Sequence, residues 1–339
     1  MIESLNIKNY RMFRDFNIPK LARINLIGGN NNCGKTSFLE AIRLLESKFG
    51  ASVLYDIIRS RGDIGSDTLK MYSSIYSNKN DNIKSIVIGN FIMYVTLHDN
   101  TIIDKIRVYD YQEYLNIKRL QDKMIPHFTD KNQVDQFFSN DYISEIALYN
   151  QAKDSIPNDK AIYIPFTIES KRNDEFWKKT VLTPREDDVL KILQIIEPKI
   201  KKFSIIEGNG TILIEGEDEP RPLKNLGDGA NRILTIALAL VNAKDKALLI
   251  DEFEVGLHYS AQEKLWDIIF EYAKLWNVQV FVTTHSLDTL RSFRYVCDRY
   301  EGEGQYFRLS KSRQNADIEA VKYDKETLQT AIDENYEPR

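Results

Sequence analysis

The feature that most constrains this 339-residue chain is a loop at residues 28–37, which reads Gly-Gly-Asn-Asn-Asn-Cys-Gly-Lys-Thr-Ser. It follows an apolar run at residues 21–27 that is typical of a strand. It precedes residues 36–48, whose apolar side chains recur at helical spacing before a natural stop at Gly50. Residues 29–36 therefore match the pattern G-x-x-x-x-G-K-[ST] in its required strand–loop–helix context.

A loop of this kind is suited to bind the phosphates of a nucleotide. Its glycines let successive N–H groups point at the β-phosphate, and the helix N-terminus adds partial positive charge. Lys35 can reach the β- and γ-phosphates, and the Thr36 hydroxyl can bind Mg²⁺. The alternative, an accidental match in a Gly/Asn-rich turn, does not explain the flanking strand and helix. The predicted nucleotide-binding residues of the loop are Gly29, Asn30, Asn31, Asn32, Cys33, Gly34, Lys35, Thr36 and Ser37.

Composition limits the class of protein. The chain is 42% hydrophobic and 28% charged, and its length suits two compact units or one large α/β domain with an insertion. No run approaches the roughly 20 apolar residues of a membrane span, and the N-terminus does not resemble a secretion signal, so we expect no membrane partner. Cys33 and Cys297 cannot build a disulfide framework, which indicates a reduced, cytoplasmic setting.

The charge balance does not favour a chain-wide nucleic-acid surface, because the formal net charge is −4. A local basic groove is still an alternative. For mixed charge runs, a solvated face is the more common explanation than a DNA contact surface. The mildly clustered basic residues are Lys118, Arg119, Lys123, Lys171, Arg172, Lys178, Lys179, Lys199, Lys201 and Lys202.

The N-terminal half predicts short strands and an insertion. Residues 2–7 and 16–19 are strand-like, as are residues 86–97 and 101–108 on either side of a turn candidate at 98–100. We interpret residues 51–159, which carry no chemical motif, as an inserted α+β lobe.

The C-terminal half has an α/β rhythm, which implies a largely parallel sheet with helices on its faces. A capping-box signature at residues 260–263 predicts the start of one helix. The other expected elements are strands at 161–166, 247–250 and 278–282, helices at 186–197 and 230–243, and a hairpin formed by 203–206 and 211–214.

The strand at residues 247–250 ends in two carboxylates that complete a phosphate-transfer site. Asp251 can hold Mg²⁺ through water, and Glu252 can polarise a water for attack on the γ-phosphate. Many buried strands end at an acidic turn, so the motif gains its weight from the phosphate loop upstream.

The order of the motifs resembles the ABC-type ATPase heads of the SMC/RecF group, and their wording resembles the OLD-like AAA ATPases. The latter are the ATPase modules of overlapping-lysogenisation-defect nucleases and of several bacterial anti-phage systems. The likeness covers roughly residues 1–50 and 160–339. It is carried by Asn-Tyr-Arg-Met-Phe at 9–13, the loop at 29–37, Leu-Gly-Asp-Gly at 226–229, Asp-Glu-Phe-Glu-Val-Gly-Leu-His at 251–258 and Thr-Thr-His-Ser at 283–286.

This resemblance implies roles for further residues. His285 would be the switch histidine that contacts the γ-phosphate, and Arg11 would contact the ribose or the α-phosphate. The signature turn, which meets the γ-phosphate bound by a second subunit, would consist of Leu226, Gly227, Asp228, Gly229 and Ala230. Asp228 and Ala230 depart from the transporter-type signature, so the geometry of this turn is open.

Two features of the resemblance stay unassigned from sequence. Glu254 and His258 fit either intersubunit contacts or metal ligands, although four histidines and no nearby cysteine disfavour a metal. The glutamine of the usual lobe-connecting loop has no clear counterpart, and residues 162–171 are where it would be expected.

The resemblance implies an ABC-type P-loop ATPase head with a mainly parallel core sheet, N-terminal antiparallel strands and the inserted lobe. The ATPase domain would comprise residues 1–50 and 160–339. Only 54 residues follow His285, so we expect no Toprim nuclease domain. The sequence has no heptad array, so we expect no coiled-coil arms.

We expect ATP and Mg²⁺ as cofactors and a homodimer or higher oligomer around two ATP molecules. The expected output is control of a separate effector, such as a nuclease in anti-phage defence. The alternatives are a DNA repair or recombination ATPase, a transporter subunit and a non-hydrolysing ATP sensor. Asp228 and residues 254–258 count against the transporter, and Glu252 counts against the sensor.

Overall fold

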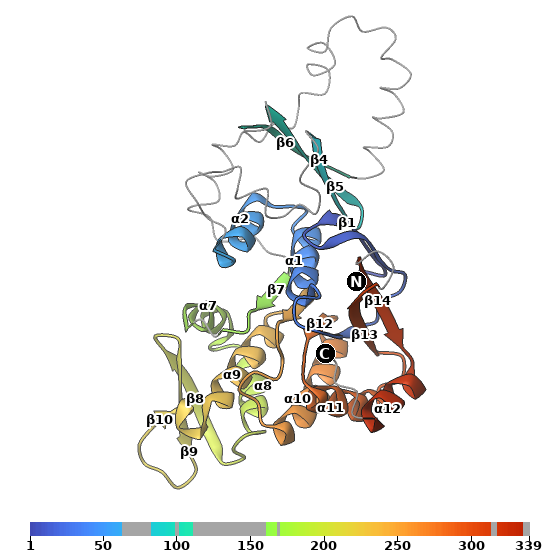
Figure 1. The fold of residues 1–339 in the computed structure, drawn as a ribbon. Coiled ribbons are helices and arrows are strands. Elements are labelled where there is room, and N and C mark those ends of the chain that lie inside the picture. Colours follow the sequence, from blue (N-terminus) through green and yellow to red (C-terminus); the bar gives the residue numbers. More distant parts are fainter. Residues whose placement is uncertain (63–82, 99–101, 111–160, 168–169, 313–316, 335–339) are drawn as a thin grey trace, which may run out of the picture.

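The computed structural model describes residues 1–62, 83–98, 102–110, 161–167, 170–312 and 317–334, and Figure 1 shows their arrangement. The fold is α/β, around a six-stranded sheet of order β14-β13-β3-β12-β11-β7. Five of these strands run parallel, and β14 pairs antiparallel with β13 at one edge. The mainly parallel core sheet is confirmed. The strands are β3 (Ile24–Gly29), β7 (Ala161–Ile164), β11 (Ala247–Ile250), β12 (Gln279–Thr283), β13 (Gly304–Lys311) and β14 (Ile318–Tyr323).

The central strands are apolar along their whole length because both faces of the sheet are covered. In β11, Leu248 and Ile250 contribute to one hydrophobic core and Leu249 to the other. In β12, Val282 and Phe281 likewise belong to opposite cores. All five side chains are fully buried, so the sheet is the partition between two cores.

Helices cover both faces of the sheet. The core on one face includes side chains of α1 (Lys35–Glu46) and α2 (Ala51–Ser60) together with the N-terminal strands. The core on the other face is built mainly from α8 (Arg185–Leu193), α9 (Asp228–Val241), α10 (Tyr259–Leu275) and α11 (Leu287–Cys297). α1 follows β3 directly, as the apolar spacing predicted.

The N-terminal strands form a separate antiparallel sheet of order β2-β1-β4-β5-β6. Pairing of β1 with β4 joins the first strands of the chain to strands from residues 51–159. The boundary of the predicted inserted lobe therefore stays a prediction, and most of that segment lies outside the described residues. The strands are β1 (Leu5–Tyr10), β2 (Phe13–Ile18), β4 (Ile83–Ile88), β5 (Phe91–His98) and β6 (Ile102–Asp110).

One strand prediction in this region is wrong. Residues 86–97 are not a single strand, because β4 ends at Ile88 and β5 begins at Phe91. Gly89 makes the reversal possible, since its φ of 57° lies in the left-handed region that glycine adopts without steric cost. The apolar side chains continue through this turn, so their pattern did not reveal it. The second predicted strand is confirmed as β6, and the turn candidate at 98–100 falls largely outside the described residues.

A smaller three-stranded sheet lies beside α7 and α9, at the lower left of Figure 1. The predicted hairpin is confirmed, with Glu207 and Gly208 at its tip in positive-φ conformations. The elements here are α7 (Ser170–Thr180), β8 (Ile200–Ile206), β9 (Asn209–Ile214), β10 (Arg221–Pro222) and the 3₁₀ helix η2 (Leu223–Leu226).

The start of α10 differs from its prediction. Ser260 was expected to open the helix in a capping box, but α10 begins at Tyr259 and His258 is its N-cap. The His258 side chain accepts a hydrogen bond from the backbone N–H of Ser260, which replaces the hydroxyl cap.

The last helix is α12 (Lys325–Asp333). Among the residues that the structure describes, no helix combines the length and the apolar character needed to cross a bilayer.

Candidate functional site

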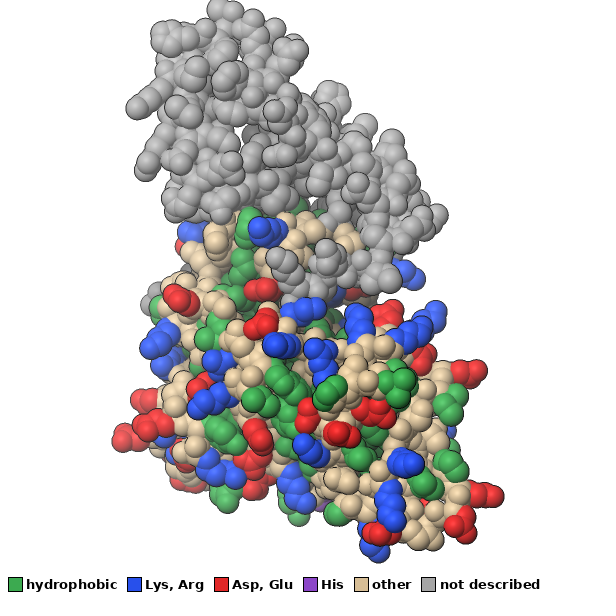
Figure 2. Space-filling model, turned by 180° about the vertical axis from the view of Figure 1, so that it is seen from behind, with side chains coloured by type: hydrophobic (Ala, Val, Ile, Leu, Met, Phe, Trp, Pro, Cys, Tyr) green, Lys and Arg blue, Asp and Glu red, His purple; other side chains and the backbone are tan. Residues whose placement is uncertain are grey.

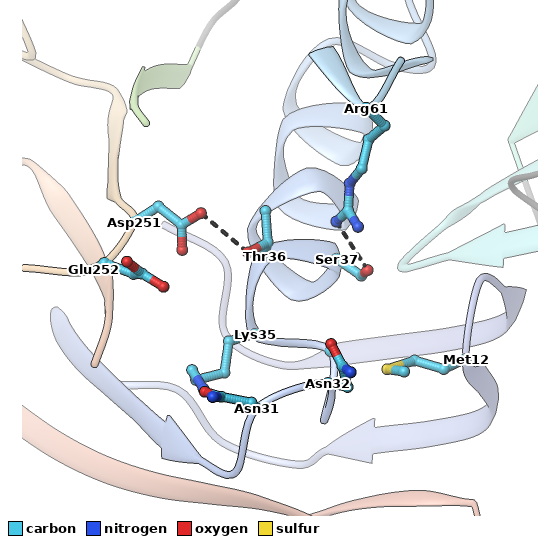
Figure 3. Close-up of a pocket in the computed structure, with 10 residues that line it drawn as sticks. Met12, Asn31, Asn32, Lys35, Thr36, Ser37, Arg61, Asp251 and Glu252 are labelled. Carbon is cyan, nitrogen blue, oxygen red and sulfur yellow. Dashed lines mark hydrogen bonds between the residues drawn. The ribbon is translucent and has the colours of Figure 1, made fainter. Parts of the chain in front are cut away.

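A cavity of about 470 Å³ lies at the carboxyl ends of β3 and β11, around the start of α1. In Figure 3, Asp251 and Glu252 lie on one side of it and Met12 on the other, with Lys35 and Thr36 between them. The phosphate loop and the two carboxylates thus share one site. Thr36 and Asp251, which meet there, are 215 positions apart in the chain. The lining residues are Met12, Asn31, Asn32, Gly34, Lys35, Thr36, Ser37, Arg61, Asp251 and Glu252.

The glycines of the loop are required by close packing. Gly34 has a φ of 91° and immediately precedes α1, and a Cβ there would lie 2.8 Å from the Met12 sulfur. Gly29 has a φ of 144°, and a Cβ there would clash with the backbone carbonyl of Leu309 on β13. The Cys33 side chain is buried, and burial raises the pKa of its thiol. Because Gly29 and Gly34 let the backbone curl around the start of α1, the loop can offer backbone N–H groups and the α1 N-terminus to an anion.

Lys35 lies over the loop with its charged end held by backbone carbonyls. Its Nζ donates to the oxygen of Gly29 at 2.7 Å and to that of Asn30 at 3.1 Å. The residue is only 9% exposed, so its charge is largely removed from bulk water. A phosphate oxygen would be a stronger partner for this ammonium than a neutral carbonyl.

Asp251 is held by hydroxyl groups from three different elements. Thr36 Oγ1 donates to Oδ2 at 3.0 Å, Thr283 Oγ1 donates to Oδ1 at 2.5 Å, and the Tyr163 hydroxyl donates to Oδ2 at 3.3 Å. Burial raises the pKa of Tyr163, and the negative charge of Asp251 adds to that effect. The phenol therefore stays protonated and able to donate.

The residues present fit a magnesium ion. The Thr36 hydroxyl and the Asp251 carboxylate offer converging oxygen atoms, which are the ligands that Mg²⁺ prefers. In the described part of the chain, no group of three or more His, Cys, Asp or Glu side chains could hold a metal by itself. A magnesium ion here would therefore depend on these two residues together with water and phosphate oxygens.

Glu252 has an uncommon backbone conformation. Its φ is 50°, which a non-glycine residue rarely adopts, and its N–H donates to Thr283 Oγ1 at 2.9 Å. Figure 3 shows the carboxylate beside the cavity, next to Asp251. Backbone strain of this kind is concentrated at functional sites, where the surrounding structure maintains it.

A buried arginine that the sequence analysis missed supports this strained turn. Arg232, in the first turns of α9, is 1% exposed. Its guanidinium donates to the carbonyls of Pro165 and Asp251, each at 2.6 Å, and to that of Glu252 at 3.2 Å. Burial lowers the pKa of Arg232, while the charges of Asp251 and Glu254 raise it. The sequence signal was a single arginine inside an otherwise apolar helix.

Arg232→Met is expected to reduce the free energy of unfolding by about 2–3 kcal/mol, because one buried and two partly buried carbonyls lose a charged donor. Urea denaturation monitored by circular dichroism measures this difference. Arg59→Met is the matched control, because Arg59 is an exposed arginine on α2. If both variants lose less than about 0.5 kcal/mol, the effect usual for surface positions, the bracing role of Arg232 is wrong.

A second missed residue, Arg61, reaches the cavity from beyond α2. Its Nε donates to Glu40 Oε1 at 2.8 Å, and its NH2 donates to Ser37 Oγ at 3.3 Å. Arg11, which was expected to contact the nucleotide, instead forms a 2.9 Å ion pair with Glu40 Oε2 and is not among the lining residues. Its contact with nucleotide stays a prediction. Arg61 lies outside every sequence motif, so no signal pointed to it.

The predicted signature turn lies outside this cavity. η2 ends at Leu226, and α9 begins at Asp228. Gly227, with φ 103° and ψ 163°, has open space where a Cβ would be, whereas a Cβ on Gly229 would clash with the carbonyl of Gly256. None of these residues lines the cavity, so the contact of this turn with nucleotide stays a prediction.

His285 is brought together with Glu254 rather than with the lining residues. The imidazole Nδ1 lies 3.0 Å from Glu254 Oε1. His258, the other residue whose role the sequence left open, caps α10 and packs in a tilted arrangement against Tyr259, with ring centroids 4.3 Å apart. The segment expected to connect the two lobes, residues 162–171, is described except for residues 168–169.

Comparison with known proteins gives a family match. The model of the family described as “AAA domain, putative AbiEii toxin, Type IV TA system” matches residues 96–291, which is more than half of the chain. The match includes the signature turn, both carboxylates and His285, and the phosphate loop precedes it.

Two relatives extend the comparison. An "ATP/GTP phosphatase" of Helicobacter pylori is 24% identical over 325 residues, covering 84% of this chain and 85% of the relative. An uncharacterized protein of Methanocaldococcus jannaschii is 38% identical over 86 residues, covering 24% of this chain and 38% of the relative.

Two solved structures are similar in fold. An SMC head bound to the C-terminal winged-helix domain of ScpA has a TM-score of 0.53 at 12% identity, covering 97% of this chain and 99% of that one. An SMC head from Pyrococcus furiosus, bound to the C-terminal domain of ScpA, has a TM-score of 0.50 at 11% identity, covering 99% of both chains. With the parallel core sheet, this likeness shows the fold of an ABC-type P-loop ATPase head.

Proposed function

The chain belongs to this AAA domain family and is an ATPase, and on that premise we propose that ATP is bound and hydrolysed in the cavity around Lys35. The observation that carries the proposal is the meeting of Lys35, Asp251 and Glu252 at one cavity. Phosphate transfer needs a cation for the phosphates, a carboxylate for the metal and a carboxylate for the attacking water.

Each residue has a distinct part in the proposed reaction. Lys35 would exchange its carbonyl partners for β- and γ-phosphate oxygens. Thr36 and Asp251 would hold Mg²⁺, which neutralises charge on the β- and γ-phosphates. Glu252 would accept a proton from the water that attacks the γ-phosphorus, and ADP would leave in line with that attack.

Lys35→Ala is expected to weaken ATP binding at least about tenfold, or 1.4 kcal/mol, because the loop loses its one inward-facing ammonium. Isothermal titration with ATP and Mg²⁺ measures the change. Lys20→Ala is the control, because Lys20 is an exposed lysine outside the site. Affinity within about twofold of wild type in the Lys35 variant would rule out the proposed site.

We further propose that two chains close head-to-tail around two ATP molecules. The signature turn lies outside its own chain's cavity and presents the N-terminus of α9, which suits an anion bound by a second copy. ATP binding would close the dimer, and hydrolysis through Glu252 would reopen it.

We propose control of a separate effector in anti-phage defence as the biological output. The OLD-like wording of the motifs supports this, as does the family description, which names a toxin of a type IV system. The cytoplasmic setting stays a prediction. Co-purification from native cells, with and without ATP, tests the effector: a nuclease supports the proposal, whereas DNA or a permease supports an alternative.

The DNA-binding alternative has less support in the charge distribution. Figure 2 shows lysine, arginine, aspartate and glutamate side chains interspersed over the viewed face, and the described residues of that face form no extended region of one sign. A protein that tracks DNA ends needs a continuous basic surface.

A further inference from the structure

Glu254 has a carboxylate that the proposed hydrolysis does not use. It follows the catalytic carboxylates by two positions, and its side chain is 11% exposed. Oε1 accepts the backbone N–H of His285 at 2.8 Å and lies 3.0 Å from Nδ1 of the same residue. Oε2 accepts from Thr284 Oγ1 at 2.9 Å. Both oxygens are therefore committed to the segment that carries the switch histidine.

The partners of Glu254 are themselves fixed. Thr284 is fully buried, and its hydroxyl also accepts the backbone N–H of Ser286 at 3.0 Å. Ser286 in turn caps α11 by accepting from the N–H of Thr289. The His285 backbone is thus held between a β12 strand end and a capped helix, so only the ring orientation needs a further constraint.

The carboxylate supplies that constraint. Because ionised Oε1 has no proton to donate, Nδ1 must carry the hydrogen of this contact. The opposite ring nitrogen, Nε2, then points away from Glu254. With Nδ1 directed at Glu254, Nε2 is the ring nitrogen that can face the nucleotide site.

We propose that Glu254 is a positioning residue that fixes the His285 ring with Nδ1–H toward the carboxylate and Nε2 toward the γ-phosphate. The proposal rests on the proposed ATPase site and gives Glu254 a role that differs from the intersubunit contact and the metal binding considered from the sequence. A carboxylate that accepts a hydrogen bond from the second nitrogen of a histidine also fixes ring orientation at metal sites. There its removal lowers metal affinity or activity about 10–100-fold.

Glu254→Ala is expected to lower kcat about 10–100-fold while KM for ATP changes less than about threefold. Glu254→Gln, which keeps an acceptor for Nδ1–H but loses the charge, should retain more activity than Glu254→Ala. In a His285→Gln background, the added Glu254→Ala change should lower kcat less than about twofold, because the ring that Glu254 orients is absent. Glu263→Ala, at an exposed position of α10, is the control and should match wild type.

A kcat loss below about fivefold for Glu254→Ala, or an equal loss in both backgrounds, would overturn the positioning role while leaving the ATPase function intact. A wild-type protein that does not hydrolyse ATP would instead contradict the proposed function.

Imidazole ¹H–¹⁵N correlation spectra test the ring geometry without any activity. The chain has four histidines. The imidazole signals that disappear in His285→Gln are therefore those of His285. We expect Nδ1 of His285 to be protonated in the wild type and in Glu263→Ala, and to lose that preference in Glu254→Ala. An unprotonated wild-type Nδ1, or an unchanged spectrum in Glu254→Ala, would overturn the proposal.

Discussion

Glu252→Gln is expected to lower the rate of ATP hydrolysis at least about 100-fold while ATP affinity stays within about threefold of wild type. Gln keeps the size of Glu and can still hydrogen-bond the attacking water, but it cannot take the proton. The positive φ of Glu252 and the Thr283 hydroxyl bond to its N–H do not depend on the side-chain charge, so the turn should persist.

If heads close on ATP, the same variant should accumulate as an ATP-bound dimer, because hydrolysis no longer reopens it. Size-exclusion chromatography with multi-angle light scattering, with and without ATP, measures the mass directly. Glu263→Gln is the matched control, since it makes the same chemical change at an exposed position. Normal hydrolysis by Glu252→Gln would refute the base assignment, and an unchanged mass in a protein that is monomeric without ATP would refute the dimer.

The parts of the site that sequence predicted are those with short-range patterns. The phosphate loop has its glycines, lysine and threonine within eight positions, and the strand before Asp251 is a continuous apolar run. Both patterns follow from local physics: tight backbone curvature around an anion, and burial of a strand on two faces. Their meeting in one cavity followed from the rule that parallel strands place their carboxyl ends at one edge.

The residues that sequence missed act through contacts distant in the chain. Arg232 donates to Pro165, 67 positions away, and its role depends on how α9 packs beneath the ends of β7 and β11. Arg61 reaches the cavity only because α2 folds back against α1. Neither packing arrangement has a sequence signature. The apolar neighbours of Arg232 indicated only that its helix is buried, and Arg61 lies outside every motif.

Glu254 is an intermediate case. Its motif was recognised, yet spacing alone left intersubunit contact and metal binding as alternatives, with metal binding disfavoured by the few histidines. The proposed positioning role, which is neither of these, required the contact with His285, which lies at a different strand end 31 positions later. The fold also connects this loop to the signature turn, because the carbonyl of Gly256 occupies the place where a Cβ on Gly229 would lie.

That contact decides how the signature turn must be tested. A side chain at Gly229 would displace its own chain's Gly256 loop, so such a variant would damage its own carboxylate site as well as any site in a partner. Gly227 is the better position, because no heavy atom lies within 4 Å of an added Cβ. Its φ of 103° makes any side chain strained by about 1–3 kcal/mol. Gly216→Glu is a matched control, with a φ of 86° and equally open surroundings.

Gly227→Glu is expected to reduce ATP hydrolysis at least about tenfold, because it places a negative charge where the partner's γ-phosphate would dock. Mixing it with Lys35→Ala should restore activity, since each heterodimer then has one intact site. Random mixing makes about half of the dimers heterodimers, so about a quarter of wild-type turnover is the ceiling for independent sites. Steady-state phosphate release from the mixture measures the restored turnover. Wild-type turnover by Gly227→Glu alone would show that residues 226–230 are only a structural turn, because a γ-phosphate docked against them could not tolerate the added carboxylate.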